Sequence, residues 1–279
     1  MQFGIDLPNF GAFGDARILA ELAHQAESCG WDGFFIWDHI YFTDETGELP
    51  MADPWVSLGA MAMVTERIRI GALVTPLPRR RPWKVAREAV TVDRLSGGRL
   101  ILGAGLGWDA WAEYARFGED PGDRVHAEKL EEALAILVGL WSGEPFTFSG
   151  KHYTVAESRF LPTPVQQPRI PIWLAASPSK ERPLRRAAHW DGVYPISDEK
   201  ITPENVREML ALIRAERGND SPFDMVRAGF VGNMEPAEAS ALLAGYAEAG
   251  VTWWLEGFWR TDTVEDVQKR ISQGPPRLA

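Results

Sequence analysis

The segment that decides the fold is GFFIWDHI, residues 33–40. Its apolar first half is typical of a buried strand, and it ends abruptly in Trp37, Asp38 and His39. In parallel α/β folds, the loops that leave the carboxyl ends of the strands build the ligand site. His39 is therefore our first catalytic candidate, although a histidine that caps a turn through its ring nitrogens is the ordinary alternative.

Around this segment, apolar strand-like runs alternate with longer runs of helical period, as in a parallel sheet covered by crossover helices. The pattern predicts strands at Phe3–Leu7, Gly33–Trp37, Ile68–Leu73, Leu100–Ala104, Ile170–Ala175, Gly192–Ile196, Met225–Val231 and Val251–Glu256. It predicts helices at Ala16–Cys29, Pro54–Thr65, Pro82–Leu95, Asp123–Trp141, Arg182–His189, Pro203–Arg217, Pro236–Ala249 and Thr263–Ser272. Eight such pairs in 279 residues favour a closed (β/α)8 TIM barrel, of about 250 residues as a rule, over an open doubly wound sheet.

The least regular region is 143–168, where SGEPFTFSGKHYTV is typical of a short hairpin with a Ser-Gly turn. We expect a hairpin insertion before the fifth strand, within a single α/β barrel domain that spans residues 1–279.

Composition narrows the class of protein. An apolar content of 45% suffices for a large core without disulfides, and the single Cys29 lies in the apolar phase of a helix. The chain has no run of membrane-spanning length, and its start, MQFGIDLPNF, lacks a secretory signal, so a cytoplasmic location is expected. A net charge of -10 gives no electrostatic reason to bind nucleic acid. The basic run Arg79 to Arg81 is either a site for a small anion or a solvated loop.

The residues that follow the predicted strands form one candidate site. They are His39, Val74, Thr75, Gly103, Gly105, Gly107, Ser177, Lys180 and Arg182. The glycines of LGAGLGW (102–108) do not have dinucleotide-fingerprint spacing. Without a Cβ they let a flat ring approach closely, or they fit a tight barrel corner.

Other chemistries have weaker support in the sequence. The remaining histidines are scattered, so no metal site is predicted, and there is no G-x-S-x-G elbow. The close acid partner of His39 is its neighbour Asp38. A proton-handling histidine without a metal or a nucleophile suits a bound organic cofactor.

Several blocks follow one another in the order of a known family: GWDGFFIWDH, TERIRIGALVTP, DRLSGGRLILGAGLGW, LWSGEPFTFSGKHY and PVQQPRIPIWLAAS. Over about residues 3–195 the chain resembles the bacterial luciferase-like monooxygenase superfamily. The resemblance implies a (β/α)8 barrel that binds reduced FMN or coenzyme F420 at its mouth, for monooxygenation or hydride transfer.

The resemblance also implies roles for particular residues. His39 would lie near the reactive centre of the cofactor ring, with Asp38 beside it. A non-proline cis peptide between Leu73 and Val74 would form a bulge behind the ring, next to Thr75. The glycine loop would be Gly103, Gly105 and Gly107, and the phosphate loop Ala175, Ala176 and Ser177.

The chain departs from its relatives at two places. Many relatives carry a glycine pair in the phosphate loop, so Lys180, Arg182 or Arg186 would compensate here by charge. Trp108 stands where the sugar-phosphate dehydrogenases of the superfamily carry an acid, which disfavours that activity.

The sequence therefore predicts a luciferase-like oxidoreductase or monooxygenase. F420 is favoured over FMN because the Asp38-His39 pair resembles the deazaflavin branch. A small, fairly apolar organic substrate would lie among Trp37, Trp108 and Trp111, unless these belong to the barrel core. A separate flavin or F420 reductase and a homodimer are allowed. The alternative is a non-catalytic flavin-binding barrel of the same fold.

Overall fold

The computed structural model describes residues 1–119, 122–219, 221–259 and 262–277. Parallel strands close a barrel in the order β1-β12-β11-β10-β9-β6-β5-β2, so the closed-barrel prediction is confirmed and the open sheet is wrong. The barrel strands are β1 (Gln2–Leu7), β2 (Gly33–Ile36), β5 (Arg69–Pro76), β6 (Leu100–Gly105), β9 (Ile172–Ala176), β10 (Gly192–Pro195), β11 (Asp224–Gly229) and β12 (Trp253–Gly257).

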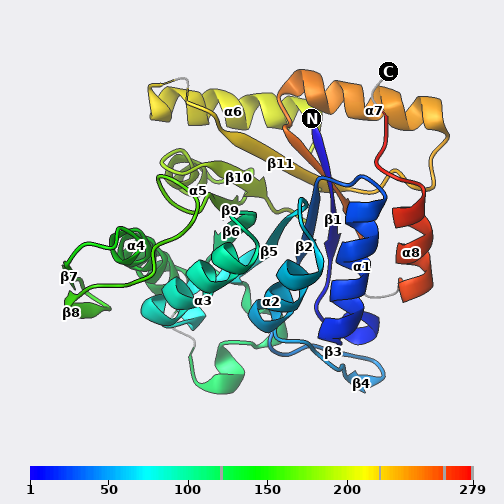
Figure 1. Cartoon of the computed structure of the whole chain (residues 1–279). Helices are drawn as coiled ribbons and strands as arrows, with labels where there is room; N and C mark the ends of the chain where they lie inside the picture. The colour runs from blue at the N-terminus through cyan, green and yellow to red at the C-terminus, as the bar shows by residue number, and fades with distance from the viewer. Residues whose placement is uncertain (120–121, 220, 260–261, 278–279) are drawn as a thin grey trace.

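Helices follow the strands and surround the barrel (Figure 1). They are α1 (Ala16–Ser28), α2 (Pro54–Val64), α3 (Pro82–Leu95), α4 (Gly122–Trp141), α5 (Glu181–Ala187), α6 (Pro203–Arg217), α7 (Pro236–Ala249) and α8 (Val264–Ser272). Their starts follow the local sequence: Asp53 caps α2 with Pro54 in the first turn, and Thr202 forms a capping box with Asn205 at α6. In the described ranges, no helix is long and apolar enough to cross a membrane.

The expected insertion is an antiparallel hairpin of β7 (Phe146–Ser149) and β8 (Thr154–Ser158). Shorter elements were not predicted. They are the two-stranded pair β3 (Thr43–Asp44) and β4 (Gly47–Glu48), and the 3-10 turns η1 (Gly11–Phe13), η2 (Leu77–Arg79), η3 (Asp109–Trp111) and η4 (Ala115–Phe117). These short elements follow β1, β2, β5 and β6, so they build the loops at the carboxyl end of the barrel.

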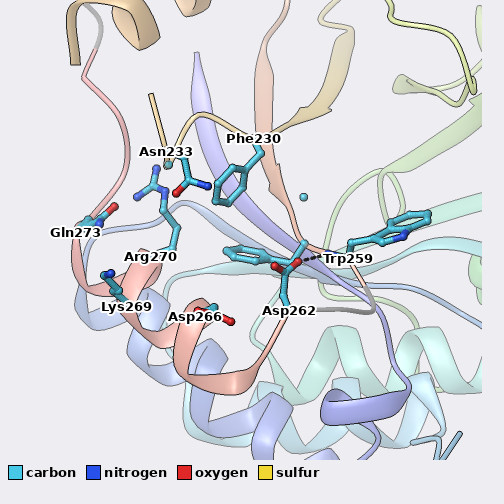
Figure 2. Close-up of a pocket in the computed structure, with 11 residues that line it drawn as sticks. Phe230, Asn233, Trp259, Asp262, Asp266, Lys269, Arg270 and Gln273 are labelled. Carbon is cyan, nitrogen blue, oxygen red and sulfur yellow. Dashed lines mark hydrogen bonds between the residues drawn. The ribbon is translucent and has the colours of Figure 1, made fainter. Parts of the chain in front are cut away.

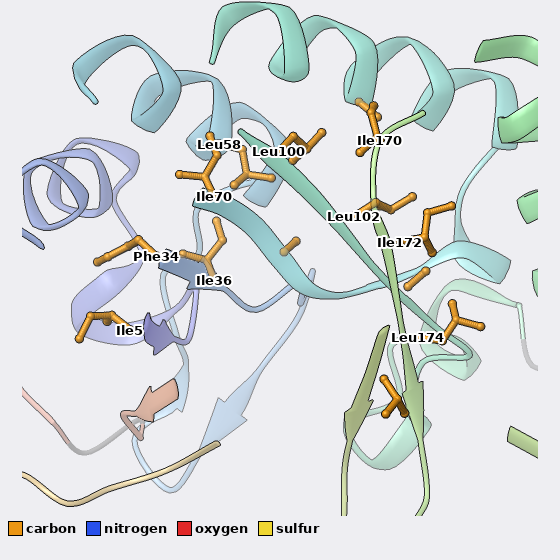
Figure 3. Close-up of a cluster of buried hydrophobic side chains, with 14 of the residues drawn as sticks. Ile5, Phe34, Ile36, Leu58, Ile70, Leu100, Leu102, Ile170, Ile172 and Leu174 are labelled. Atoms are coloured by element: carbon orange, nitrogen blue, oxygen red, sulfur yellow. The ribbon is translucent and has the colours of Figure 1, made fainter. Parts of the chain in front are cut away.

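The core has two layers because successive side chains of a strand point to opposite faces. The outer layer, between strands and helices, contains Ile5, Phe34, Ile36, Ile70, Leu100, Leu102, Ile172 and Leu174 (Figure 3). The lumen is filled by Phe35, Leu73, Ile101, Trp173, Tyr194, Val226, Trp253 and Leu255.

Beyond this filled lumen, towards the carboxyl ends, the inward positions become small. Continuing the alternation along β6, β9, β11 and β12 gives Gly105, Ala175, Ala228 and Gly257. The barrel is therefore packed below and has room at its mouth, where the loops carry the candidate residues.

Candidate active site at the barrel mouth

The bulge expected on β5 is present. The register between β5 and β6 shifts between Ala72 and Thr75, and the Leu73–Val74 peptide bond is cis, as predicted. Val74 is half-buried, whereas Thr75 is fully buried. The Thr75 hydroxyl oxygen has no hydrogen-bond partner among the described residues, so it is an unused polar group behind the bulge.

Glycines keep the surface beside the bulge flat. A Cβ on Gly105 would lie 2.8 Å from Val74 Cγ2 and 3.2 Å from the Cβ of Ala175, and one on Gly103 would lie 2.3 Å from the Ala72 carbonyl oxygen. Val74, Gly105 and Ala175 thus meet across the adjacent strands β5, β6 and β9. A flat surface next to an unpartnered hydroxyl fits a planar heterocycle with polar edges, such as a flavin or deazaflavin.

Gly107 has a different role. Its φ of +78° lies in the left-handed region, and a Cβ there would lie 2.7 Å from the hydroxyl of Tyr114. That hydroxyl donates to the Leu106 carbonyl oxygen at 2.7 Å, so Gly107 allows the loop after β6 to turn tightly over Tyr114.

The loop after β9 carries the predicted phosphate contacts. Ala176 is buried, Ala175 and Ser177 are half-buried, and the Ser177 hydroxyl lies 3.1 Å from that of Ser179. Lys180 and Arg182 are exposed at the start of α5, and neither side chain has an ion pair within the described part of the chain. Both remain available to an anion, whereas Arg186 pairs with Glu131 at 2.9 Å. Their contact with phosphate stays a prediction.

His39 is held by an acid from a distant loop. Its Nδ1 lies 2.8 Å from Oε2 of Glu113, and the two side chains are 17% and 4% exposed. Because an ionised carboxylate only accepts hydrogen bonds, Nδ1 carries the proton, and Nε2 is the ring nitrogen left for a ligand. Aromatic rings surround the imidazole edge-on, with Trp111 at 5.1 Å, Phe10 at 5.7 Å and Trp37 at 5.9 Å between ring centroids.

Glu113 itself is fully engaged. Its Oε1 accepts from the Ile40 amide at 2.7 Å and pairs with Arg79 Nη1 at 3.0 Å. Burial alone would raise the pKa of Glu113, but the hydrogen bond and charge of His39, together with Arg79, lower it overall. Glu113 therefore stays ionised and fixes the orientation of the imidazole. The expectation that Asp38 is the acid partner of His39 is wrong.

Asp38 instead faces the arginines. Its fully buried carboxylate pairs with Arg79 at 2.9 Å and with Arg80 at 2.7 Å. The sequence suggested that the basic run Arg79 to Arg81 is either a small-anion site or a solvated loop. Neither describes Arg79 and Arg80, because η2 turns both guanidinium groups onto acids of this chain, while Arg81 is exposed. Buried charges need such partners. A contact between Asp38 and a cofactor stays a prediction.

Tryptophans form a wall on the open side of His39. Trp108 is 62% exposed and lies 5.3 Å from Trp111, and Trp259 is 54% exposed and lies 5.2 Å from Trp37. Trp37, Trp108 and Trp111 thus lie at the mouth, while Trp173 and Trp253 fill the barrel core. This wall favours a ligand with an apolar body.

Comparison with known proteins decides the family. The sequence profile of the luciferase-like monooxygenase family matches residues 1–270. The chain belongs to this family.

Two relatives of this luciferase-like chain match it over different lengths. An uncharacterized protein of Mycobacterium bovis is 31% identical over 253 residues, which cover 85% of this chain and 86% of that protein. The F420-dependent glucose-6-phosphate dehydrogenase of Microbacterium testaceum is 35% identical over 167 residues, covering 59% of this chain but only 48% of the dehydrogenase. The match therefore spans about half of that enzyme.

A solved structure supports the fold over the whole length. The F420-dependent secondary alcohol dehydrogenase in complex with an F420-acetone adduct superposes with a TM-score of 0.81, at 18% identity, over 99% of this chain and 98% of that one.

Glu113 is the functional residue that sequence reasoning missed in this luciferase-like chain. It lies 74 positions from His39, in a loop without helical or strand periodicity. Trp108 occupies the position where the sugar-phosphate dehydrogenases of the superfamily carry an acid. Glu113, later in the same loop, nevertheless brings a carboxylate to the imidazole. A search for acids throughout the loops after the barrel strands would have included it.

A cavity was also not predicted. It has a volume of about 440 Å³ and lies between the loops after β11 and β12 and one side of α8 (Figure 2). Phe230, Phe258 and Trp259 supply aromatic lining, and Asn233, Lys269 and Arg270 supply polar lining. Gly257, the last residue of β12, also lines it and connects it to the barrel mouth.

Proposed function

We propose that this luciferase-like protein is an oxidoreductase that uses F420, with FMN as the alternative, on a small apolar organic substrate. The observation that carries the proposal is the pairing of a flat cradle with a held imidazole. Val74, Gly105 and Ala175 make the cradle, and Glu113 orients His39 at the same mouth.

Each part of the mouth has a task in this proposal. Reduced F420 or FMN supplies a hydride when bound. The cradle supports one face of the ring, and the Thr75 hydroxyl, otherwise unpartnered among the described residues, offers a hydrogen bond behind the bulge. His39 gives or takes a proton through Nε2, while Glu113 holds Nδ1 protonated.

F420 is preferred over FMN for two reasons. The Asp38-His39 pair resembles the deazaflavin branch, and the relative from Microbacterium testaceum is an F420-dependent enzyme. Lys180 and Arg182 are the proposed cationic partners of the cofactor phosphate. A separate reductase would supply the reduced cofactor.

The substrate class follows from the wall of the mouth. Trp37, Trp108, Trp111 and Trp259 present aromatic surface around His39, which suits an apolar molecule more than a highly charged one.

The test is a titration of the protein with F420, FMN and riboflavin under identical conditions, followed by absorbance. F420 should bind most tightly, and riboflavin, which lacks the phosphate, least tightly. If none of the three binds, the proposal is wrong. Tighter binding of FMN than of F420 selects the alternative cofactor. Turnover of small ketones and aldehydes with the reduced cofactor, and of small alcohols with the oxidised cofactor, then separates an enzyme from a non-catalytic flavin-binding barrel, which binds without turnover.

A further inference from the structure

A second acid lies beneath the mouth and has no part in the function proposed above. Asp6 is the penultimate residue of β1 and is only 2% exposed. Its partners in register are Phe35 on β2, which lies in the lumen, and Gly257 on β12, which lines the cavity. The Asp6 carboxyl is therefore inside the barrel, close to its open end.

The hydrogen bonds of this carboxyl are incomplete. The Tyr194 hydroxyl, from β10, donates to Oδ2 at 3.1 Å, and Trp37 also bonds to the carboxyl. Oδ1 is buried and has no partner within the described residues. A buried polar atom without a partner is costly, and such an atom at a ligand site calls for an explanation.

The protonation state of Asp6 is unusual. Burial raises its pKa to about 7 from an ordinary 3.8, against the hydrogen bonds from Trp37 and Tyr194, which lower it. Burial likewise raises the pKa of Tyr194, and Arg227 on β11 is the cation near this pair. In the loop after β2, the His39 ring lies 5.9 Å from the Trp37 ring. At neutral pH a large fraction of the protein molecules thus carry Asp6 as a neutral acid, with an O–H to donate.

The surroundings connect Asp6 to the candidate substrate space. Trp37 contacts both His39 and Trp259. A Cβ on Gly257 would lie 3.8 Å from the Gly229 carbonyl oxygen and 3.9 Å from the Ala228 Cβ, which are ordinary contacts, so small groups surround this end of β12. The acid therefore lies just below the space bounded by the aromatic wall and the cavity.

We propose that Asp6 and Tyr194 form a polar subsite that donates a hydrogen bond from the Asp6 carboxyl to an uncharged oxygen, a ketone or a hydroxyl, of the substrate. This rests on the proposed function and names its substrate class. A substrate that carries a carboxylate at this position is disfavoured, because Asp6 in its ionised form repels it.

The first experiment separates this role from a structural one. A group whose folded pKa lies above its unfolded value stabilises the fold at low pH, and this stability is lost as pH rises from about 4 to about 7. Asp6→Asn removes that loss, so its melting temperature should exceed that of the wild type at pH 8. An Asn variant that is less stable than the wild type at every pH would mean that the carboxyl only supports the fold.

The second experiment reads the carboxyl directly by infrared difference spectroscopy of wild type minus Asp6→Asn. We expect a carboxylic-acid C=O band that disappears as pH rises through about 7. Cyclohexanone and cyclohexanol should shift this band, and cyclohexane, of similar shape, should not. Tyr194→Phe should change the position of the band.

Asp224→Asn is the matched control. Asp224 is another acid whose pKa burial raises, but it begins β11 at the opposite end of the barrel, bonded to Trp173 and Thr252. The infrared signal of the Asp224 carboxyl, taken as wild type minus Asp224→Asn, should not respond to the three probes. The proposal is overturned if no protonated Asp6 band exists near pH 6. It is also overturned if neither oxygen-containing probe shifts the band, which is the result expected if an internal water fills the place beside Oδ1. The infrared experiment contains no cofactor, so its outcome is independent of the cofactor titration. If the oxygen-containing probes shift the band but neither F420 nor FMN binds in the titration, the proposed function is wrong and this subsite stands.

Discussion

At the scale of single residues, the candidate chemistry depends on His39 and on the acid that orients it. Glu113 accepts hydrogen bonds from His39 Nδ1 and from the Ile40 amide, and it pairs with Arg79. One carboxylate therefore connects the loops after β2, β5 and β6. The side chain that handles the proton is thus held by buried charge and not by its sequence neighbour Asp38.

Replacing His39 tests the proton-handling role. His39→Ala should keep the fold and cofactor binding but lower turnover on the order of 10²-fold or more, as for loss of a general acid or base. His189→Ala is the matched control, because His189 is exposed on the outside of the barrel, 3.9 Å from Glu216. Wild-type rates in folded His39→Ala, at saturating cofactor, would show that the imidazole is only structural.

Replacing Glu113 tests the buried network through its pH dependence. The pKa of Glu113 is lowered in the folded protein, so its stabilisation is present above pH about 4.5 and is lost as pH falls through the folded pKa. Glu113→Gln should lower the free energy of unfolding by about 3 to 5 kcal/mol at pH 7, as when one partner of a buried pair is removed. The difference should shrink in acid. Denaturant unfolding at several pH values measures this difference in the free energy of unfolding, with Glu119→Gln, at an exposed position, as the control. A difference between wild type and Glu113→Gln that does not depend on pH would contradict the account.

At the scale of elements, what sequence could predict depended on periodicity. Strand and helix boundaries shift by at most three residues, and the largest shift is on β5, which continues through the bulge to Pro76. The short elements at the mouth were missed because two-residue strands and single 3-10 turns have no period to detect. The family resemblance supplied the cis bond at Leu73–Val74, which no pattern of residue types gives.

The start of α5 has its own prediction. Lys180 and Arg182 are exposed at the predicted phosphate loop, so cofactor affinity should fall with added salt, and Arg182→Ala should weaken F420 or FMN binding about tenfold. Riboflavin binding should hardly change. Arg185→Ala, which removes the same charge from an arginine paired with Glu216, is the control. Equal losses for FMN and riboflavin in Arg182→Ala would mean that the arginine supports the loop and does not contact phosphate.

At the scale of the whole molecule, the barrel brings together residues that the sequence keeps apart. His39 follows β2, and Val74, Gly105 and Ala175 lie near the carboxyl ends of the neighbouring strands β5, β6 and β9, so the strand order explains their common mouth. Three features depend on loop and side-chain packing: the contact with Glu113, the inward turn of Arg79 and Arg80, and the cavity between α8 and the loops after β11 and β12. No periodic pattern encodes these.

The central claim is that the cradle of Val74, Gly105 and Ala175 holds a flat cofactor ring. The most direct measurement is the affinity of Gly105→Ala for F420 and FMN, by absorbance titration, compared with Gly59→Ala on α2, where an added Cβ meets nothing within 4 Å. Because a Cβ at Gly105 would press on Val74 and Ala175, affinity should fall about tenfold or more, while Gly59→Ala binds like the wild type. Unchanged affinity in a folded Gly105→Ala protein would contradict the account, because the ring would then not rest on this surface.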